Sequence, residues 1–226
     1  MTSQSVPIPE PSLRRLPIYY RRLRQALDQG VEVVSSKELG ESVGVPDAQV
    51  RKDLSYLELD GRPGVGYGAR SLAAQLEEFL GLVNDKEAVM VGAGNLGMAL
   101  AMYPGFVRYG LQIVALFDID PAKLGALPDG RQVLPVEKLT DLVSRLQVRI
   151  GIITAPESVA QGIADAMVAG GIQVIWNFAS CKLKVPADVL VKNQDLAAEL
   201  ATLSHHISQR RIRQASAQQD KSPAPA

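Results

Sequence analysis

Apolar residues recur at helical spacing at the start of the chain. Gly30 follows the last of them and supplies a stop, so the pattern predicts a helix from Leu13 to about Gln29. Its apolar positions are Leu16, Tyr19, Tyr20, Leu23, Ala26 and Leu27. Residues 1–12 contain three prolines and little apolar pattern, which predicts a flexible arm.

Two shorter helices are expected next. The first, SSKELGESVGV, begins at Ser35 with Glu38 three residues later, the spacing of a capping box, and reaches Gly44 after two turns. The second, PDAQVRKDLSYLEL, has Asp47 as its possible cap. Its apolar stripe consists of Val50, Leu54 and Leu57. Two short helices joined by a tight glycine-containing turn predict a helix-turn-helix.

Polar residues of this region are candidates for contacts with DNA. Arginine and lysine pair with guanine edges or phosphates, and hydroxyl groups suit phosphates. The loop DGRPGVGYG is rich in glycine, as expected for a β-hairpin wing, so residues 13–83 are predicted to form a winged helix-turn-helix domain. The candidates are Ser35, Ser36, Gln49, Arg51, Lys52, Ser55, Tyr56, Arg62, Gly64 and Tyr67. The alternative is a helical hairpin that only packs against the rest of the chain.

Short apolar strands alternate with helices in the second part of the chain. A helix at 71–82 leads to a polar break, after which strands are expected at 88–91, 111–118, 149–154, 172–178 and 189–191, and helices at 95–108, 135–147 and 157–169. This alternation predicts a Rossmann domain, a doubly wound parallel sheet, over residues 84–193. One amphipathic helix at 194–213 and a polar, disordered tail at 214–226 remain.

The first of these strands runs into the spacing G-x-G-x-x-G. Gly92 permits a tight turn, Gly94 lets a pyrophosphate approach the backbone, and Gly97 allows close packing of the helix that follows. The amino end of that helix favours an anion. The alternative is the glycine-rich turn of an α/β domain without a dinucleotide.

An acidic residue follows at the expected distance. Asp118 ends the next strand, 21 residues after Gly97, where a carboxylate receives a ribose 2′-hydroxyl. No arginine follows it directly, and Asp120 adds a second carboxylate that would repel a 2′-phosphate, which favours NADH and NAD⁺ over the phosphorylated cofactors. The candidate cofactor residues are Gly92, Ala93, Gly94, Asn95, Leu96, Gly97, Asp118, Ile119, Thr154, Ala155 and Pro156.

Composition limits the classes of protein. The 226 residues carry no formal net charge and are 46% hydrophobic, as in an ordinary globular protein. No apolar run is long enough for a membrane helix and no signal peptide is evident, so a cytoplasmic protein is predicted. Cys181 is the single cysteine, and His205 and His206 are adjacent, which predicts no metal site.

The joint order of motifs resembles that of the Rex family of redox-sensing transcriptional repressors, over roughly residues 13–210. The motifs are VRKDLSY (50–56), GVGY (64–67), VGAGNLGMALAMYPGF (91–106), FDIDP (117–121), NFA (177–179) and NQDL (193–196). The resemblance implies a homodimer that binds a palindromic operator in double-stranded DNA and releases it when NADH binds. It also implies that the helix at 194–213 is swapped between subunits.

The same resemblance implies the residues of the switch. Tyr103 would also bind the cofactor, because it and the partner's aspartate, here Asp195, would meet near the reduced nicotinamide. Without NADH the aspartate would pair with Arg21. A carboxylate with two alternative partners is a bistable element that a ligand can bias.

No catalytic residue is predicted. A dehydrogenase needs a substrate domain and an acid-base group near the nicotinamide, and the sequence leaves no segment for such a domain. Two alternatives remain open: an NAD-dependent oxidoreductase with an appended regulatory domain, and a CoA- or nucleotide-binding module without DNA binding.

Overall fold

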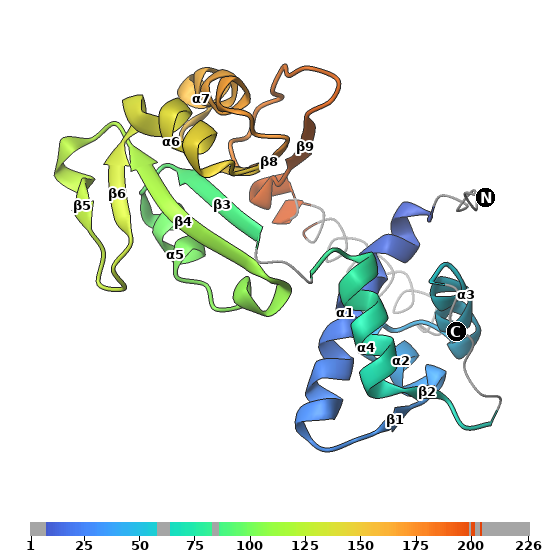
Figure 1. The fold of residues 1–226 in the computed structure, drawn as a ribbon. Helices are drawn as coiled ribbons and strands as arrows, with labels where there is room; N and C mark the ends of the chain where they lie inside the picture. Colours follow the sequence, from blue (N-terminus) through green and yellow to red (C-terminus); the bar gives the residue numbers. More distant parts are fainter. Residues whose placement is uncertain (1–7, 58–63, 83–85, 199, 202–203, 205–226) are drawn as a thin grey trace, which may run out of the picture. The chain divides into compact units, whose positions relative to one another are not determined.

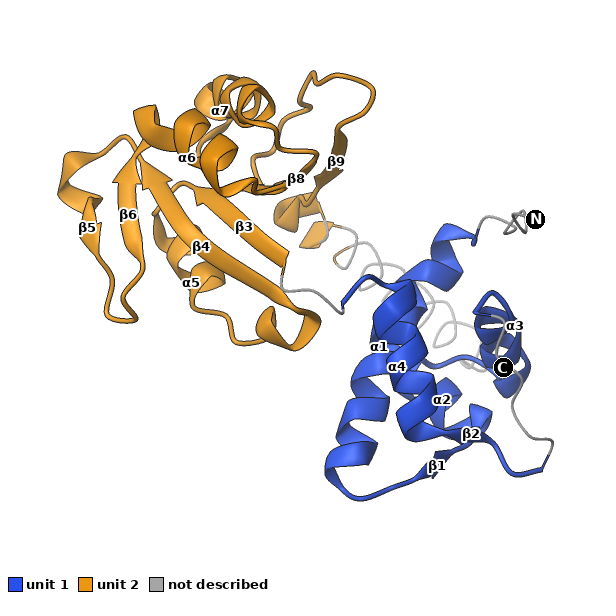
Figure 2. Cartoon of the chain, in the orientation of Figure 1, with its two compact units in different colours: residues 1–85 blue, residues 86–226 orange. Residues whose placement is uncertain are grey.

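The chain divides into two compact units, residues 1–85 and 86–226 (Figure 2). The structure is a computed structural model that describes residues 8–57, 64–82, 86–198, 200–201 and 204. Most of the predicted arm, the greater part of the predicted helix at 194–213 and the predicted tail at 214–226 lie outside the described residues. The division between the units falls two residues after the boundary that the sequence suggests.

Unit 1 is helical with one small sheet. In chain order it contains α1 (Glu10–Asp28), β1 (Val33–Val34), α2 (Ser36–Val43), α3 (Asp47–Ser55), β2 (Tyr67–Gly68) and α4 (Ala69–Phe79) (Figure 1). Helix α1 packs against α4 and α2, and α2 packs against α3. The core is formed by the apolar stripes of these helices, with Leu16, Tyr19, Leu23, Leu39, Leu54 and Leu76 fully buried. The predicted helix-turn-helix is therefore present as α2 and α3.

Helix α1 begins earlier than the periodicity predicts. Its first residue is Glu10 rather than Leu13, and Pro11 occupies the first turn. Proline suits that turn because its fixed φ is helical and its missing N–H has no intrahelical acceptor there. Ser12 is buried and its hydroxyl accepts a hydrogen bond from Arg15. The end of the predicted arm is thus part of the helical core.

The caps of α2 follow the prediction, and that of α3 does not. Ser35 and Glu38 form both hydrogen bonds of the capping box, and Gly44 ends α2 in the left-handed region with φ 71°. The prediction that Asp47 caps α3 is wrong, because Pro46 occupies the cap position and Asp47 is the first helical residue. At this position the Asp47 carboxylate accepts a hydrogen bond from Arg51, one turn later, at 2.6 Å.

The small sheet joins segments on either side of the helix-turn-helix. Strand β1 pairs antiparallel with β2, with Val34 opposite Tyr67. The end of the predicted wing, β2, therefore pairs with β1, the strand that precedes α2. Within the described residues it does not form a hairpin with a neighbouring strand of its own loop. Arg62 lies outside them.

Unit 2 has the predicted doubly wound architecture. Its elements are β3 (Lys86–Val91), α5 (Asn95–Ala101), a 3₁₀ turn (Val107–Tyr109), β4 (Leu111–Asp118), a 3₁₀ turn (Pro121–Lys123), β5 (Gly125–Ala126), β6 (Gln132–Pro135), a 3₁₀ turn (Val136–Lys138), α6 (Leu139–Leu146), β7 (Ile150–Ile153), α7 (Glu157–Gly170), β8 (Val174–Asn177) and β9 (Leu190–Asn193). The sheet order is β5-β6-β4-β3-β7-β8-β9, parallel except for β5. The chain reverses direction of winding at β3 and β7, the position where such sheets bind ligands.

Helices cover both faces of this sheet (Figure 1). Because side chains alternate along a strand, Ala88 and Met90 of β3 pack on the side of α5, while Val89 and Val91 pack with α6 and α7. The buried strands are apolar on both faces for this reason. In the described residues, no helix is both long enough and apolar enough to cross a membrane.

Two features of unit 2 differ from the sequence expectation. Helix α5 ends at Ala101 rather than near Arg108, because Pro104 lacks an N–H and disfavours helical geometry at Tyr103. Strands β5 and β6 were not predicted. They are short, and β6 has only one fully buried residue, Val133, so their apolar pattern is too brief to recognise.

Candidate functional site

A cavity of about 880 Å³ lies in unit 2, at the carboxyl ends of β3, β4 and β7. Seven of the predicted cofactor residues line it: Gly92, Gly94, Asp118, Ile119, Thr154, Ala155 and Pro156. Asp120, which the sequence indicated as a second carboxylate, also lines it. Further walls come from side chains that the sequence did not single out, among them Lys123, Val136, Glu137, Val159 and Ile163. The volume is within the range of small-molecule sites.

The three glycines of the turn serve three different needs. Gly92 has φ +107°, and a Cβ there would lie 2.7 Å from the backbone carbon of Thr154. A Cβ on Gly97 would overlap the carbonyl oxygen of Gly92. A Cβ on Gly94 would meet no atom within 4 Å, and Gly94 lines the cavity. Gly92 and Gly97 are thus needed by the fold, whereas Gly94 leaves the cavity open beside the backbone.

Thr154 holds this turn in place. Its hydroxyl donates to the carbonyl oxygens of Gly92 at 2.8 Å and Val91 at 3.2 Å, and its N–H donates to Val91 at 2.9 Å. The hydroxyl is therefore engaged in linking β7 to the glycine turn. Thr154 lines the cavity with a side chain whose proton is already donated.

Asp118 is the charged centre of the cavity wall. It is 7% exposed, and its carboxylate accepts hydrogen bonds from the N–H groups of Ala93 at 2.8 Å and Asp120 at 2.9 Å. The ammonium of Lys123 lies 3.1 Å from the same carboxylate. Burial alone would raise the pKa of Asp118, but these N–H donors and the Lys123 ammonium outweigh it and lower the pKa. The carboxylate is therefore ionised at neutral pH.

Lys123 corrects the electrostatic part of the sequence interpretation. That interpretation placed two carboxylates at the ribose position without a nearby cation. Lys123 lies 4.0 Å from Asp120 as well as 3.1 Å from Asp118, because the 3₁₀ turn at 121–123 folds the chain back over the end of β4. Lys123 is five residues after Asp118 in the chain, so the residues directly after Asp118 give no sign of it.

Besides Tyr103, four predicted cofactor residues do not line this cavity. Ala93 and Gly97 are buried beneath the turn, and Asn95 and Leu96 are exposed on α5. Ala93 contributes through its backbone, since its N–H fixes Asp118. Ala93 and Gly97 thus support the turn, and the side chains of Asn95 and Leu96 face solvent.

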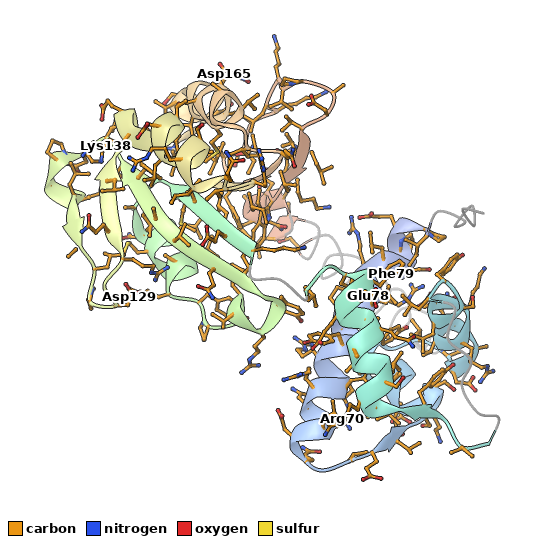
Figure 3. All side chains as sticks on the ribbon, in the orientation of Figure 1. Arg70, Glu78, Phe79, Asp129, Lys138 and Asp165 are labelled. Atoms are coloured by element: carbon orange, nitrogen blue, oxygen red, sulfur yellow. The ribbon has the colours of Figure 1, made fainter. Side chains whose placement is uncertain are left out.

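Tyr103 lies at a second cavity of about 310 Å³ and not in the first. Its side chain is 56% exposed, and the cavity is also lined by Phe106, Asp129 and Arg131. Figure 3 labels Asp129 in the turn between β5 and β6. Tyr103 contacts Phe106 edge to face, with ring centroids 5.3 Å apart. Its exposure results from the early end of α5.

The NFA and NQDL motifs meet at the edge of the sheet. The buried amide of Asn177 donates to the carbonyl of Cys181 and to the side chain of Asn193, both at 2.9 Å, and the Asn177 carbonyl accepts from the N–H of Gln194 at 2.8 Å. The next residue, Asp195, accepts from the N–H groups two and three residues later, at 3.0 and 2.9 Å. Asp195 is therefore the cap of the helical segment that begins at residue 196.

The helix-turn-helix presents part of the predicted DNA-contact set. Arg51, Lys52 and Ser55 of α3 are exposed, and so is Gly64. Ser36 and Tyr56 are partly exposed, and the Ser35 hydroxyl is engaged in the capping box.

Two predicted DNA contacts are placed differently by the fold. Tyr67 is 8% exposed and belongs to the core of unit 1, so its ring packs inward, and its contact with DNA stays a prediction. Gln49 is half-buried and its amide donates to Asp53 at 2.9 Å. The pairing of β1 with β2 places the Tyr67 ring in the core, and the hydrogen bond to the buried Asp53 carboxylate holds the Gln49 amide.

A buried ion pair joins α1 to α3. Asp53 is fully buried, and Arg15 donates to its two oxygens at 2.6 and 2.7 Å, while the Tyr19 hydroxyl donates at 2.9 Å. Burial alone would raise the pKa of Asp53, but these donors and Gln49 lower it. The same cluster raises the pKa of Tyr19, first through burial and then through its bond to Asp53. This cluster was not predicted, because Arg15 and Tyr19 lie 38 and 34 residues from Asp53 in the chain.

A helix-turn-helix unit and a Rossmann unit with a nucleotide-sized cavity stand together on one chain. This combination defines the class of ligand-responsive DNA-binding proteins. Residues 7–55 match the family model described as "Putative DNA-binding protein N-terminus", and residues 83–181 match the one described as "CoA binding domain".

Relatives that span the chain identify the family. The redox-sensing transcriptional repressor Rex of Desulfitobacterium hafniense is 41% identical over 92% of this chain and 99% of its own, and that of Syntrophomonas wolfei is 43% identical over 89% and 96%. A solved structure of RSP, a Rex-family repressor, with NAD⁺ and operator DNA matches this chain with a TM-score of 0.85 and 35% identity. The match covers 96% of this chain and 100% of RSP. The structure of RSP with NADH matches with a TM-score of 0.80 and 36% identity, over 93% of this chain and 99% of RSP. The chain belongs to the Rex family of redox-sensing transcriptional repressors. The resemblance inferred from the motifs is confirmed.

Proposed function

We propose that this protein represses transcription as a homodimer on a palindromic operator and releases the DNA when NADH binds, in the cytoplasm. The observation that carries the proposal is that unit 1 exposes Arg51 and Lys52 on α3 of a helix-turn-helix, while unit 2 of the same chain has a glycine-lined cavity. The redox-sensing repressors that share the whole chain support it. A CoA-binding module does not account for unit 1, and an oxidoreductase does not account for relatives that are repressors.

The cavity fits a dinucleotide. The open position beside Gly94 suits a pyrophosphate, because a chain of atoms can approach the backbone there without meeting a side chain. The ionised carboxylate of Asp118, held by two N–H groups and Lys123, is oriented to accept from ribose hydroxyls. The cofactor supplies the redox state that is sensed, and the residues of the chain only bind it.

On the DNA side, α3 is the recognition helix. Arg51 and Lys52 provide the cationic contacts, and Ser36 and Ser55 provide hydroxyls near them. Arg62 and Gly64 belong to the proposed wing. The Ser35 capping box fixes the start of α2, so that residue supports the interface through the helix geometry.

The helical segment after Asp195 is the proposed dimer element. Leu196 and Leu200 are 55% and 64% exposed in the single chain, and an amphipathic helix with such leucines requires an apolar partner surface. The proposed switch is made by Asp195 with Arg21 in the DNA-bound state and with Tyr103 in the NADH state. All three side chains are exposed, so each is accessible to a second subunit.

The proposed function is tested by titrating NADH, NAD⁺ and CoA into a complex of the protein with a duplex that it has selected from a random-sequence library. NADH is expected to release the duplex, NAD⁺ to leave most of it bound, and CoA to have no effect. Fluorescence anisotropy of a labelled duplex measures the release. Release by CoA, or selection of no duplex, would contradict the proposal.

Asp195→Asn should uncouple NADH binding from DNA release. Asparagine is as good a helix cap as aspartate, so it keeps the hydrogen bonds to residues 197 and 198 but removes the charge that the switch requires. The coupling free energy should fall from a typical value of about 1 to 3 kcal/mol toward zero. Operator affinity measured with and without saturating NADH gives this value. If Asp195→Asn responds as the wild type does and only Asp195→Ala fails, the residue is a cap alone.

Lys123 and Asp118 should shift cofactor choice in opposite directions. Asp118→Ala removes a repelling charge and ribose contacts, so NADH affinity should fall and discrimination against NADPH should lessen. Lys123→Ala leaves both carboxylates uncompensated, so discrimination against NADPH should increase. Calorimetry with both cofactors measures the two ratios, with Lys182→Ala as a control outside the cavity. A shift in the same direction for Asp118→Ala and Lys123→Ala would contradict this account.

A further inference from the structure

The guanidinium of Arg51 is held by residues at the beginnings of two helices. Its Nη1 lies 2.6 Å from Oδ2 of Asp47, the first residue of α3, and 3.4 Å from Oγ of Ser36, the first residue of α2. Both contacts use the same nitrogen. Within the part of the chain that the structure describes, Nε and Nη2 of Arg51 make no such contact. The fork of Arg51 is thus fixed on one side and left available on the other.

This ion pair faces solvent at the amino end of α3. The side chains of Arg51 and Asp47 are 55% and 48% exposed. In a helix-turn-helix, the amino-terminal residues of the second helix contact base edges in the major groove. The hydrogen bonds from Arg51 and from the N–H of Ala48 lower the pKa of Asp47, so its carboxylate is charged at neutral pH. A fixed negative charge therefore stands beside the arginine of the proposed DNA-binding surface.

The two charges act differently on specific and non-specific binding. Bidentate recognition of guanine requires the planar fork of arginine in one orientation, and a held side chain loses less rotamer entropy on binding. A carboxylate opposes contact with phosphates of any sequence. Specificity is a difference of affinities, so an element that opposes the wrong duplex contributes as much as one that favours the right duplex.

We propose that Asp47 is a specificity-determining residue of operator binding. It positions Arg51 so that Nε and Nη2 face a base edge, and its charge lowers affinity for unrelated DNA. This inference rests on the proposed function of α3.

The chain offers a matched control. Glu10 and Arg14 of α1 form another ion pair between residues four apart, at 3.0 Å and with side chains 61% and 65% exposed. Glu10→Gln removes one negative charge from the same unit, as Asp47→Asn does, but outside the helix-turn-helix. Asp47→Asn keeps a side-chain oxygen for the N–H of Ala48. The two variants therefore have the same net charge, and they differ in whether Arg51 is released.

The experiment measures affinity of the full-length protein for two duplexes. One is selected by the wild type from a random-sequence library, and the other has the same composition in shuffled order. In Asp47→Asn the ratio of the two affinities should fall about tenfold, within the range that one bidentate base contact contributes to discrimination. Most of the fall should come from tighter binding to the shuffled duplex. Glu10→Gln should keep the wild-type ratio.

Single base-pair changes in the selected duplex give the second readout. Arg51→Ala should relax discrimination at particular positions, and Asp47→Asn should relax it at the same positions. Uniform relaxation at all positions, or an unchanged ratio in Asp47→Asn while Arg51→Ala lowers it, overturns the inference and leaves the proposed function intact. If the wild type selects no duplex, the proposed function fails and the inference fails with it.

Discussion

Asp53→Ala should lower the free energy of unfolding of unit 1 by about 3 to 5 kcal/mol, the cost of removing one partner from a buried ion pair. The variant leaves the Arg15 guanidinium, whose side chain is 19% exposed, without its carboxylate, and also removes the acceptor of the Tyr19 hydroxyl. Arg15 and Tyr19 lie on α1, whereas Asp53 lies on α3. Helix α3 should therefore lose its main polar attachment to α1.

The two units can be followed separately in the full chain. Trp176 is the single tryptophan and lies in β8 of unit 2, so its fluorescence reports unit 2, while circular dichroism also reports the helices of unit 1. In urea, Asp53→Ala should shift the helical transition and leave the Trp176 transition unchanged. Glu10→Gln, which breaks an exposed pair, should cost about 1 kcal/mol or less. A helical transition within 1 kcal/mol of the wild type for Asp53→Ala would mean that the cluster contributes little.

The same cluster predicts how stability depends on pH. The pKa of Asp53 is lowered in the folded state, so the unfolded chain binds this proton at a higher pH than the folded chain does. The stabilisation is present in full above the unfolded pKa of about 4 and is lost as the pH falls through the folded value. Asp53→Asn should therefore show a smaller loss of unit 1 stability on acidification than the wild type, measured by urea unfolding at several pH values.

Gly97→Ala should lower the stability of unit 2, whereas Gly94→Ala should lower only its affinity for NADH. A Cβ on Gly97 overlaps the carbonyl of Gly92 and lies 2.8 Å from the Thr154 hydroxyl, both part of the packed turn, so the variant should lose about 3 kcal/mol of stability. A Cβ on Gly94 meets nothing within 4 Å, so stability should be unchanged. It would instead occupy the space proposed for the pyrophosphate and weaken NADH binding by about 1 to 3 kcal/mol.

Unfolding monitored by Trp176 and calorimetry with NADH distinguish these two effects. Gly94→Ala should retain operator binding without cofactor, because unit 1 is unaltered, and should need more NADH for release. Gly97→Ala should unfold at lower urea concentration. If Gly94→Ala binds NADH as tightly as the wild type, the pyrophosphate does not approach the backbone at this position.

Local chemistry was sufficient for most elements and for the glycine turn. The capping box of Ser35 and Glu38, the strand from Leu111 to Asp118 and the positive φ of Gly92 depend on neighbouring residues, on side-chain periodicity and on backbone sterics. These interactions are short in sequence and are the same in any protein, so the pattern of residues determines them. The family resemblance added the homodimer, the operator and the residues of the switch.

Tertiary structure decided the features that depend on distant partners. Asp53 meets Arg15 across 38 residues, and Tyr67 is buried because β2 pairs with a strand on the other side of the helix-turn-helix. Lys123 reaches Asp118 through a 3₁₀ turn at the end of β4. In each case the sequence supplies a charged or aromatic side chain. Its burial and the element that faces it determine whether that side chain contacts DNA, orients a cofactor residue or stabilises the core.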